Sequence, residues 1–135
     1  MQPMSTFIGI AHPWMCDVMG HVNVRHYAAM FDDAGFHFLG ELARDEPEGT
    51  GWADVRVETE FLREISPGTL ITIRSQMVRI GRSSITYRHE MKGTLDDIAR
   101  ATALVTTVRF DLAARRAAPL SGAILTRAAA LIPAQ

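Results

Sequence analysis

The sequence predicts an α+β domain in which one long helix covers one face of an antiparallel sheet. Apolar residues recur at steps of three and four over residues 24–43, which is the period of a helix buried along a single stripe. From residue 55 onward the period becomes two, and short turn sequences separate β-branched runs, as in consecutive strands. A helix with one apolar stripe and a sheet with one apolar face can bury each other, so we expect two packed layers.

The helix is expected to begin at Val24 and to run to about Ala43. Asn23 is suited to be its N-cap, because the side-chain oxygen can accept from a backbone N–H that has no partner inside the helix. Residues 45–51 contain one proline and two glycines, which end helices. The apolar stripe consists of Tyr27, Phe31, Ala34, Phe38 and Leu42.

Four strands are expected after the helix, over residues 55–62, 69–80, 84–91 and 99–111. Ser66-Pro67-Gly68, Gly81-Arg82 and residues 93–97 supply the turns between them. Such strands are predicted to pair in chain order as an antiparallel meander. Residues 8–14 are expected to add a fifth strand. The length of 135 residues predicts a single domain, with a core over about residues 5–120 and a tail over residues 121–135.

The composition excludes several classes of function. A formal net charge of −1 argues against a general nucleic-acid binder, which needs a basic surface. No apolar run approaches the ~20 residues of a membrane span, and residues 1–6 lack the features of a signal peptide. The single cysteine, Cys16, rules out an internal disulfide and favours a reducing compartment. We therefore expect a cytoplasmic protein that binds neither nucleic acid nor membrane.

The segment from Trp14 to Tyr27 combines groups that could act on a carbonyl. Asp17 precedes Gly20 and the helix start near Asn23, where unpaired N–H groups and the positive end of the helix dipole are presented. Such donors can stabilise an oxyanion, and a carboxylate beside them can attack a carbonyl or take a proton from water. Spacing alone leaves open a simpler role for Asp17, which is to cap the backbone of its own loop.

The motif Asp17-Val18-Met19-Gly20-His21-Val22-Asn23, followed by Tyr27, resembles the signature of hotdog-fold thioesterases of the 4-hydroxybenzoyl-CoA thioesterase family. That signature is an Asp, two variable residues, Gly-His-Val-Asn and an aromatic residue four positions later. The order of elements over residues 5–120, the turn at residues 66–68 and the segment 79–84 are also similar to that family. The resemblance implies a hotdog fold, a five-stranded antiparallel sheet wrapped around one long helix, assembled as a homodimer or homotetramer.

By this resemblance the protein hydrolyses an acyl-CoA thioester to a free acid and CoA, with no metal and no organic cofactor. Asp17 is the implied nucleophile or general base, and the backbone N–H of Val24 is the implied donor to the thioester carbonyl. The same resemblance implies substrate contacts for Gly20, His21, Asn23 and Tyr27. The candidates for binding CoA near the central hairpin are Arg79, Arg82, Ser83 and Ser84.

Some features depart from the family pattern or leave its details open. Val24 stands where many relatives carry a second Asn, and Met15 stands where some carry an acidic residue, which affects the expected substrate more than the fold. Another hotdog lineage has its carboxylate within the helix, so Asp32 and Asp33 are alternatives to Asp17. The acyl group stays open, since its pocket could use any of several aromatic residues, namely Phe31, Phe38, Trp52 and Phe61.

Two other functions remain as alternatives. A hotdog acyl thioester dehydratase or hydratase is one, because Gly20-His21 superficially resembles the loop of that class. A non-catalytic acyl-CoA-binding module is the other, although the presence of Asp17 argues against it. The chain has no Gly-x-Ser-x-Gly elbow and no phosphate-binding glycine loop. The histidines form no close ligand pair on one helical face, so a metal site is not expected.

Overall fold

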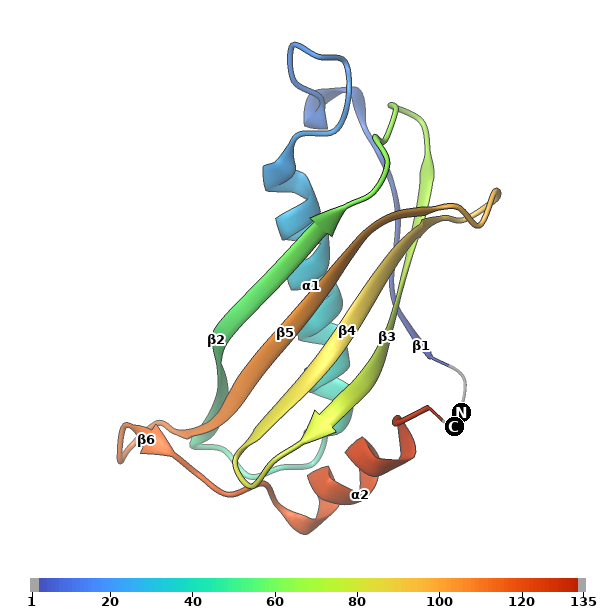
Figure 1. Ribbon diagram of the computed structural model, residues 1–135. Helices are drawn as coiled ribbons and strands as arrows, with labels where there is room; N and C mark the ends of the chain where they lie inside the picture. The colour runs from blue at the N-terminus through green and yellow to red at the C-terminus, as the bar shows by residue number, and fades with distance from the viewer. Residues whose placement is uncertain (1–2, 134–135) are drawn as a thin grey trace.

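The computed structural model describes residues 3–133, which form an antiparallel sheet, a long helix against it and a shorter helix at one end (Figure 1). The expected α+β architecture is confirmed. The elements follow in the order β1 (Met4–Ile10), a 3-10 turn (Pro13–Met15), α1 (Val24–Leu42), β2 (Thr50–Phe61), β3 (Leu70–Ile80), β4 (Ser84–Gly93), β5 (Ala99–Asp111), β6 (Arg116–Ala117) and α2 (Gly122–Ala130).

The strand order is β1-β3-β4-β5-β2, with the short β6 paired to β5. The predicted meander is therefore right for β3, β4 and β5 and wrong for β2, which pairs with β5 at the far edge. The connection over residues 62–69 is long enough to cross the end of α1, and a connection of this length does not force its strands to pair as a tight hairpin turn does. Ile65, at its middle, is fully buried and its carbonyl accepts from Val22 N–H at 3.0 Å.

The first strand lies earlier in the chain than predicted. β1 pairs antiparallel with β3 from Met4 to Ile10, whereas residues 8–14 were expected to form it. Pro13 lacks the N–H that a strand ladder needs, and the chain instead turns so that Met15 N–H donates to the His12 carbonyl at 3.0 Å.

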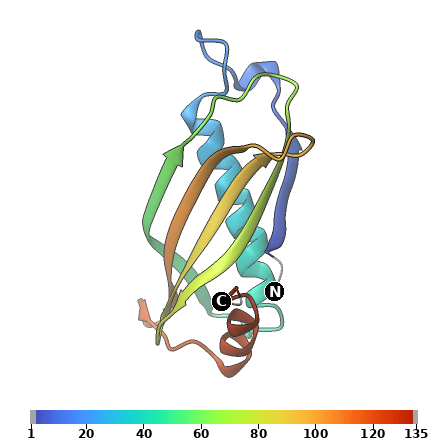
Figure 2. The ribbon, with the colours of Figure 1, turned by 45° about the vertical axis from the view of Figure 1, so that its right-hand side comes forward.

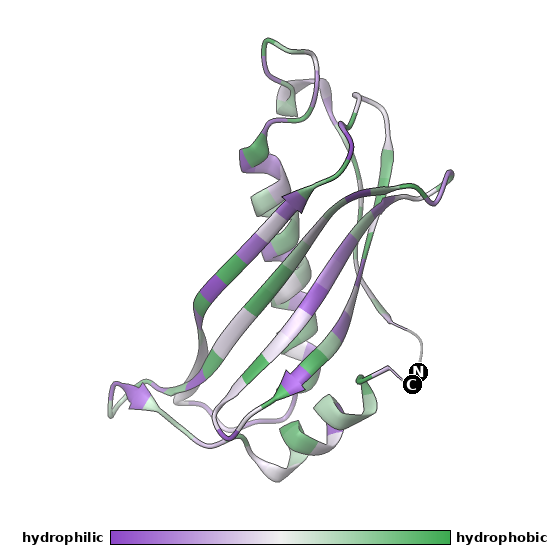
Figure 3. Cartoon of the chain, in the orientation of Figure 1, coloured by the Kyte–Doolittle hydropathy of each residue, from purple (hydrophilic) through white to green (hydrophobic). Residues whose placement is uncertain are grey.

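Helix α1 occupies the concave side of the sheet, which curves around it (Figure 2). The predicted N-cap is confirmed, because the side chain of Asn23 accepts from the Arg25 N–H. The sheet alternates apolar and polar residues along its strands, as the hydropathy colouring shows (Figure 3). The apolar face of the sheet buries the helix stripe, so that Ala34 and Phe38 have no exposed surface.

The expected tail is in fact part of the core. Residues 122–130 form α2, whose Ile124 and Ala128 are fully buried against Phe38 and Tyr87. Ser121 caps this helix by accepting from the Ile124 N–H at 3.2 Å. The spacing of four between Ile124 and Ala128 places them on one helical face. Residues 134 and 135, also assigned to the tail, lie outside the described residues.

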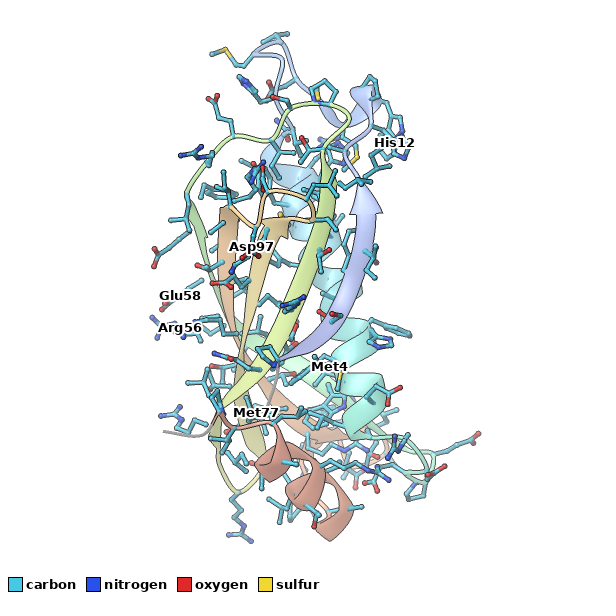
Figure 4. All side chains as sticks on the ribbon, turned by 90° about the vertical axis from the view of Figure 1, so that its right-hand side faces the viewer. Met4, His12, Arg56, Glu58, Met77 and Asp97 are labelled. Atoms are coloured by element: carbon cyan, nitrogen blue, oxygen red, sulfur yellow. The ribbon has the colours of Figure 1, made fainter. Side chains whose placement is uncertain are left out.

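Strand β2 forms one edge of the sheet and is largely exposed. Arg56 and Glu58 form an ion pair on it and point away from the body of the molecule (Figure 4). Val55 and Val57, on the same strand, are 63% and 56% exposed. A long edge strand with unpaired backbone groups and exposed apolar side chains is a surface suited to pairing with another strand. Within residues 3–133, no helix has the length and apolar character needed to cross a membrane.

Candidate active site

The loop that leads into α1 is closed by its own backbone. Cys16 and Val22 form an isolated antiparallel bridge, and the N–H of Asp17 donates to the His21 carbonyl at 3.1 Å. The N–H of Gly20 donates to the Asp17 carbonyl at 2.9 Å. Gly20 has a φ of +81°, in the left-handed region where a Cβ is disfavoured. The glycine of the motif is therefore required by the turn that presents Asp17.

The carboxylate of Asp17 is held at both oxygens. Oδ1 accepts from the backbone N–H of Met19 at 2.9 Å, and Oδ2 accepts from the side-chain amide of Asn23 at 3.1 Å. The bond from Asn23, followed by the bond from Met19, lowers the pKa of Asp17 below its ordinary value of 3.8. Hydrogen bonds to the charged form favour that form. Asp17 is thus an oriented carboxylate that is ionised at neutral pH.

Val24 presents a backbone donor next to this carboxylate. It is the first residue of α1, so its N–H has no acceptor inside the helix. The neighbouring Arg25 N–H is already used, since it donates to Asn23 Oδ1 at 3.1 Å. No acceptor for the Val24 N–H is found among residues 3–133. Asn23 therefore stands between two groups. Its side chain binds the ionised carboxylate of Asp17, and the next residue, Val24, offers a free N–H at the positive end of the helix dipole.

His21 and Tyr27 join this loop to the end of β2. His21 Nε2 lies 3.2 Å from Glu64 Oε2, on the connection after β2. Tyr27 is 5% exposed and packs edge-on against Phe61, with ring centroids 5.1 Å apart. Burial raises the pKa of Tyr27. Tyr27 supports the loop from the core beneath it.

Three aromatic side chains gather beside the loop. Trp14 stacks on His12 at a centroid distance of 5.7 Å and meets His26 edge-on at 5.4 Å. The described part of the chain contains no group of three His, Cys, Asp or Glu side chains arranged to hold a metal ion. His12 and His26 both pack against the indole of Trp14, which is 71% exposed.

A cavity of about 1040 Å³ lies between α1 and β2, with β4 and β5 behind it. The wall that α1 and its C-cap Ala43 supply begins at Arg25, and is about 27 Å long by the rise of a helix. It therefore begins two residues after Asn23, beside the loop, although Asp17 itself does not line it. Asp32 lines the cavity and Asp33 does not.

The aromatic residues considered for an acyl pocket divide into two groups. Phe31 and Trp52 line the cavity, whereas Phe38 lies in the core and Phe61 packs on Tyr27. The packing of α1 and β2 in the folded chain decides this division, which could not be read from residue type.

The end of the cavity near the C-terminus of α1 contains a buried arginine that the sequence did not single out. Arg109 donates to Thr50 Oγ1 at 2.7 Å, lies 3.7 Å from Glu46 Oε1 and covers the ring of Trp52 at 4.8 Å. Burial lowers the pKa of Arg109, opposed by the charge of Glu46. Arg109 and Thr50 come together because β2 and β5 pair.

The residues predicted to bind CoA lie at the other end of the molecule from Asp17. Arg82 and Ser83 lie in the turn between β3 and β4 (Figure 1), Arg79 lies near the end of β3, and Ser84 begins β4. Strand β3, of 11 residues, separates this turn from the loop end by about 36 Å. The backbone of the turn is held by the chain before α2, since Leu120 N–H donates to the Arg82 carbonyl at 2.9 Å. One chain therefore does not bring the two groups of candidates together.

Comparisons with known proteins show which superfamily the chain belongs to. The model of the thioesterase-like superfamily matches residues 11–128, and the chain belongs to that superfamily. No curated protein matches the sequence significantly.

Solved structures confirm the hotdog fold. A Synechocystis 1,4-dihydroxy-2-naphthoyl-CoA thioesterase superposes with a TM-score of 0.80 at 15% identity, covering 96% of this chain and 98% of that one. A Staphylococcus aureus protein solved in complex with CoA gives 0.86 at 14% identity, covering 100% and 90%. A Bacillus stearothermophilus protein described as a predicted thioesterase gives 0.84 at 19% identity, covering 97% of each chain.

Proposed function

We propose that this protein hydrolyses an acyl-CoA thioester to a free acid and CoA, with Asp17 as its catalytic carboxylate. The observation that carries the proposal is the placement of an oriented, ionised carboxylate beside the free N–H at the start of α1, in a chain of the thioesterase-like superfamily. The CoA bound by a structural relative supports a CoA thioester as the ligand class.

The chemistry follows from these two groups. The Val24 N–H would donate to the thioester oxygen and stabilise the negative charge that develops on it. Asp17 would either attack the carbonyl carbon, forming a mixed anhydride and releasing CoA thiolate, or take a proton from a water that attacks. In the first route, water then cleaves the anhydride to the free acid and restores the Asp17 carboxylate, and the CoA thiolate released earlier takes up a proton. In the second route, the tetrahedral intermediate collapses to the free acid, and the proton held by Asp17 passes to the leaving CoA thiolate. Gly20, His21 and Asn23 would shape the substrate-facing loop, with Tyr27 beneath it.

The working form is proposed to be a homodimer or a homotetramer built on that dimer. Asp17 is exposed in the single chain, and the cavity beside it is open along β2. Pairing of β2 with the same strand of a second copy would satisfy the free edge and cover the exposed Val55 and Val57. It would also exclude water from the carboxylate, which strengthens electrostatic stabilisation.

The same pairing of two β2 strands would bring the residues predicted to bind CoA close to Asp17 of the other copy. Two copies of β2 paired antiparallel about a two-fold axis have their ends exchanged. The β3–β4 turn of the second copy would then lie at the end where the first copy holds Asp17. Arg79 and Arg82 of that turn are exposed and suited to phosphate, with Ser83 and Ser84 beside them.

Thiol release from a panel of aromatic, short and long acyl-CoA substrates tests the proposal. Asp17→Asn should lose at least about a hundredfold in kcat/KM, as expected for removal of a catalytic base or nucleophile. Asp33→Asn is the matched control, because Asp33 is an exposed helical carboxylate that does not line the cavity. Loss of activity in Asp32→Asn with full activity in Asp17→Asn would move the catalytic role to Asp32.

The panel also separates the alternative functions. Binding of acyl-CoA by wild type and Asp17→Asn alike, with hydrolysis by neither, would identify a binding module. Interconversion of a 3-hydroxyacyl-CoA and an enoyl-CoA without thiol release would identify a dehydratase or hydratase.

A further inference from the structure

The inner wall of the cavity contains a buried polar atom without a partner. His89 has no exposed surface, and its Nε2 makes no hydrogen bond within the described residues. Tyr87, on the same strand, is 2% exposed and carries a phenol hydroxyl, a group that can donate a hydrogen bond. Both side chains come from β4 and line the cavity. Buried polar atoms are normally paired, so the unpaired Nε2 at this wall is a candidate acceptor for a ligand group.

A chain of hydrogen bonds fixes the proton on His89. The Thr6 hydroxyl donates to the Ile73 carbonyl at 3.3 Å, so its oxygen accepts from the Ser75 hydroxyl at 2.8 Å. Ser75 Oγ must then accept from His89 Nδ1, 2.5 Å away. Neutral imidazole carries one N–H, which here is on Nδ1, so Nε2 is an acceptor.

Protonation does not change this assignment near neutral pH. Burial lowers the pKa of His89 to about 4, so the ring is neutral. Burial also raises the pKa of Tyr87, so its hydroxyl keeps its proton and is a donor. The wall therefore presents one acceptor and one donor close together.

A glycine of α1 packs directly against these atoms. A Cβ placed on Gly35 would lie 3.0 Å from Tyr87 Oη and 3.7 Å from His89 Nε2. Glycine within a helix is less favourable than alanine. Phe31, stacked on His89 at 5.7 Å, makes the surroundings of the two atoms apolar. Because Gly35 has no Cβ, no side chain of α1 covers the donor and the acceptor at this point, as a larger residue would.

We propose that His89 Nε2 and Tyr87 Oη form a subsite for a hydroxyl group on the acyl chain of the substrate. The hydroxyl donates to Nε2 and accepts from Oη, which satisfies both atoms. This subsite rests on the proposed thioesterase function. A carboxylate is a poorer fit, since it has no hydrogen to donate and would be charged beside apolar Phe31.

The position of the subsite selects the kind of acyl group. Gly35 is eleven residues after Val24, about 16 Å along the helix. Carbon–carbon bonds are about 1.5 Å long, so a zigzag chain of about a dozen carbons covers that distance. The substrate class is therefore a medium or long aliphatic acyl group with a hydroxyl near its far end.

Binding of free acids tests the subsite without requiring hydrolysis. Calorimetry with wild type should show about tenfold tighter binding of 12-hydroxydodecanoic acid than of dodecanoic acid, because the deoxy acid leaves the buried Nε2 of His89 without a partner. Tyr87→Phe, which keeps the ring, and Gly35→Ala, which places a methyl group against the donor and the acceptor, should each abolish that preference. Thr86→Val is the matched control, since it removes a buried hydroxyl from the opposite face of β4 and should leave the preference intact.

Several results would overturn the subsite. Equal affinities for the two acids, no binding of either, or a preference that survives Tyr87→Phe would each do so. A preference confined to 4-hydroxybenzoate over benzoate would refute the placement far from the thioester. Hydrolysis of 12-hydroxydodecanoyl-CoA and dodecanoyl-CoA is measured separately, so that absence of all hydrolysis counts against the proposed function while the acid-binding result still decides the subsite.

Discussion

The side-chain amide of Asn23 joins the carboxylate of Asp17 to the start of α1. Its nitrogen donates to Asp17 Oδ2 at 3.1 Å, and its oxygen accepts from the Arg25 N–H at 3.1 Å. The two bonds require opposite ends of the amide, so its orientation is determined. The N-cap of the helix is therefore also the residue that orients the candidate catalytic group.

Asn23→Ala is expected to change both stability and the pH profile. Loss of the cap should lower the free energy of unfolding by about 1 kcal/mol. Loss of the bond to Oδ2 should raise the pKa of Asp17, because that bond is the main cause of its lowering. Activity falls as the pH drops through this pKa, so the acid limb of kcat/KM should move to higher pH.

Ser121→Ala is the control for Asn23→Ala. Ser121 caps α2 through its own side chain and is remote from Asp17. It should show a similar loss of stability with an unchanged acid limb. An acid limb that does not move in Asn23→Ala would contradict the role assigned to Asn23.

Gly20→Ala is expected to destabilise the loop. The φ of +81° costs an L-residue about 1 kcal/mol or more, and relaxation of the turn would displace Asp17. Denaturant unfolding and kcat/KM should therefore both decline. Gly122 has no positive φ and no atom near the position of a Cβ, so Gly122→Ala should leave stability and kcat/KM unchanged. Equal effects of Gly20→Ala and Gly122→Ala would refute the role of the left-handed turn.

Stability should depend on pH through His89. Its pKa is near 6.5 when unfolded and about 4 in the folded chain because of burial. The unfolded state therefore binds more protons between these values, so stability is complete above pH 6.5 and declines as the pH falls toward 4. The loss is at most about 3 kcal/mol.

Urea unfolding at several pH values from 7 to 4 measures this effect. His89→Gln should flatten the dependence in that window, whereas His37→Gln, at an exposed position of α1, should not. Asp96, whose pKa is lowered to about 2 by Arg100, contributes to loss of stability only below about 3.8 and so leaves this window unaffected. An unchanged slope in His89→Gln would contradict the assignment.

Ile124→Ala is expected to destabilise the protein by about 2–5 kcal/mol, because it empties a fully buried position. Leu125→Ala, at a neighbouring position that is 41% exposed, should cost much less. Thermal or urea unfolding of both variants measures the contribution of α2. Equal, small effects would mean that α2 is dispensable for the core.

Phe36→Asp tests the proposed dimer. Phe36 is 85% exposed on α1 and lines the open cavity, so a second copy paired through β2 should cover it, and a charge there should dissociate the pair. Light scattering should give two or four chains of 14.9 kDa for wild type and fewer for the variant, with loss of hydrolysis. His37→Asp, next to it on the exposed side, should remain dimeric; a monomeric, fully active wild type would overturn the proposal.

The sequence by itself determined the features that depend on neighbouring residues. The period of the apolar residues defined α1, Asn23 identified its start, and the turns placed the hairpins around β4. The motif from Asp17 to Asn23 also predicted a carboxylate next to a helix start, since a loop of six residues cannot carry Asp17 far from Asn23. These features arise from local backbone preferences and short-range hydrogen bonds, which a short stretch of chain already contains.

Only the tertiary structure decided which distant segments meet. The pairing of β2 with β5 brings Trp52 to Arg109 and opens the cavity, and the burial of Ile124 makes α2 part of the core. His89 Nε2 lies beside Gly35 only because α1 packs over β4, so its lack of a partner could not be predicted from the sequence. Such contacts depend on how the whole chain buries its apolar surface. The hydrophobic effect is non-directional, so a short stretch of sequence does not specify which distant segment it will pack against.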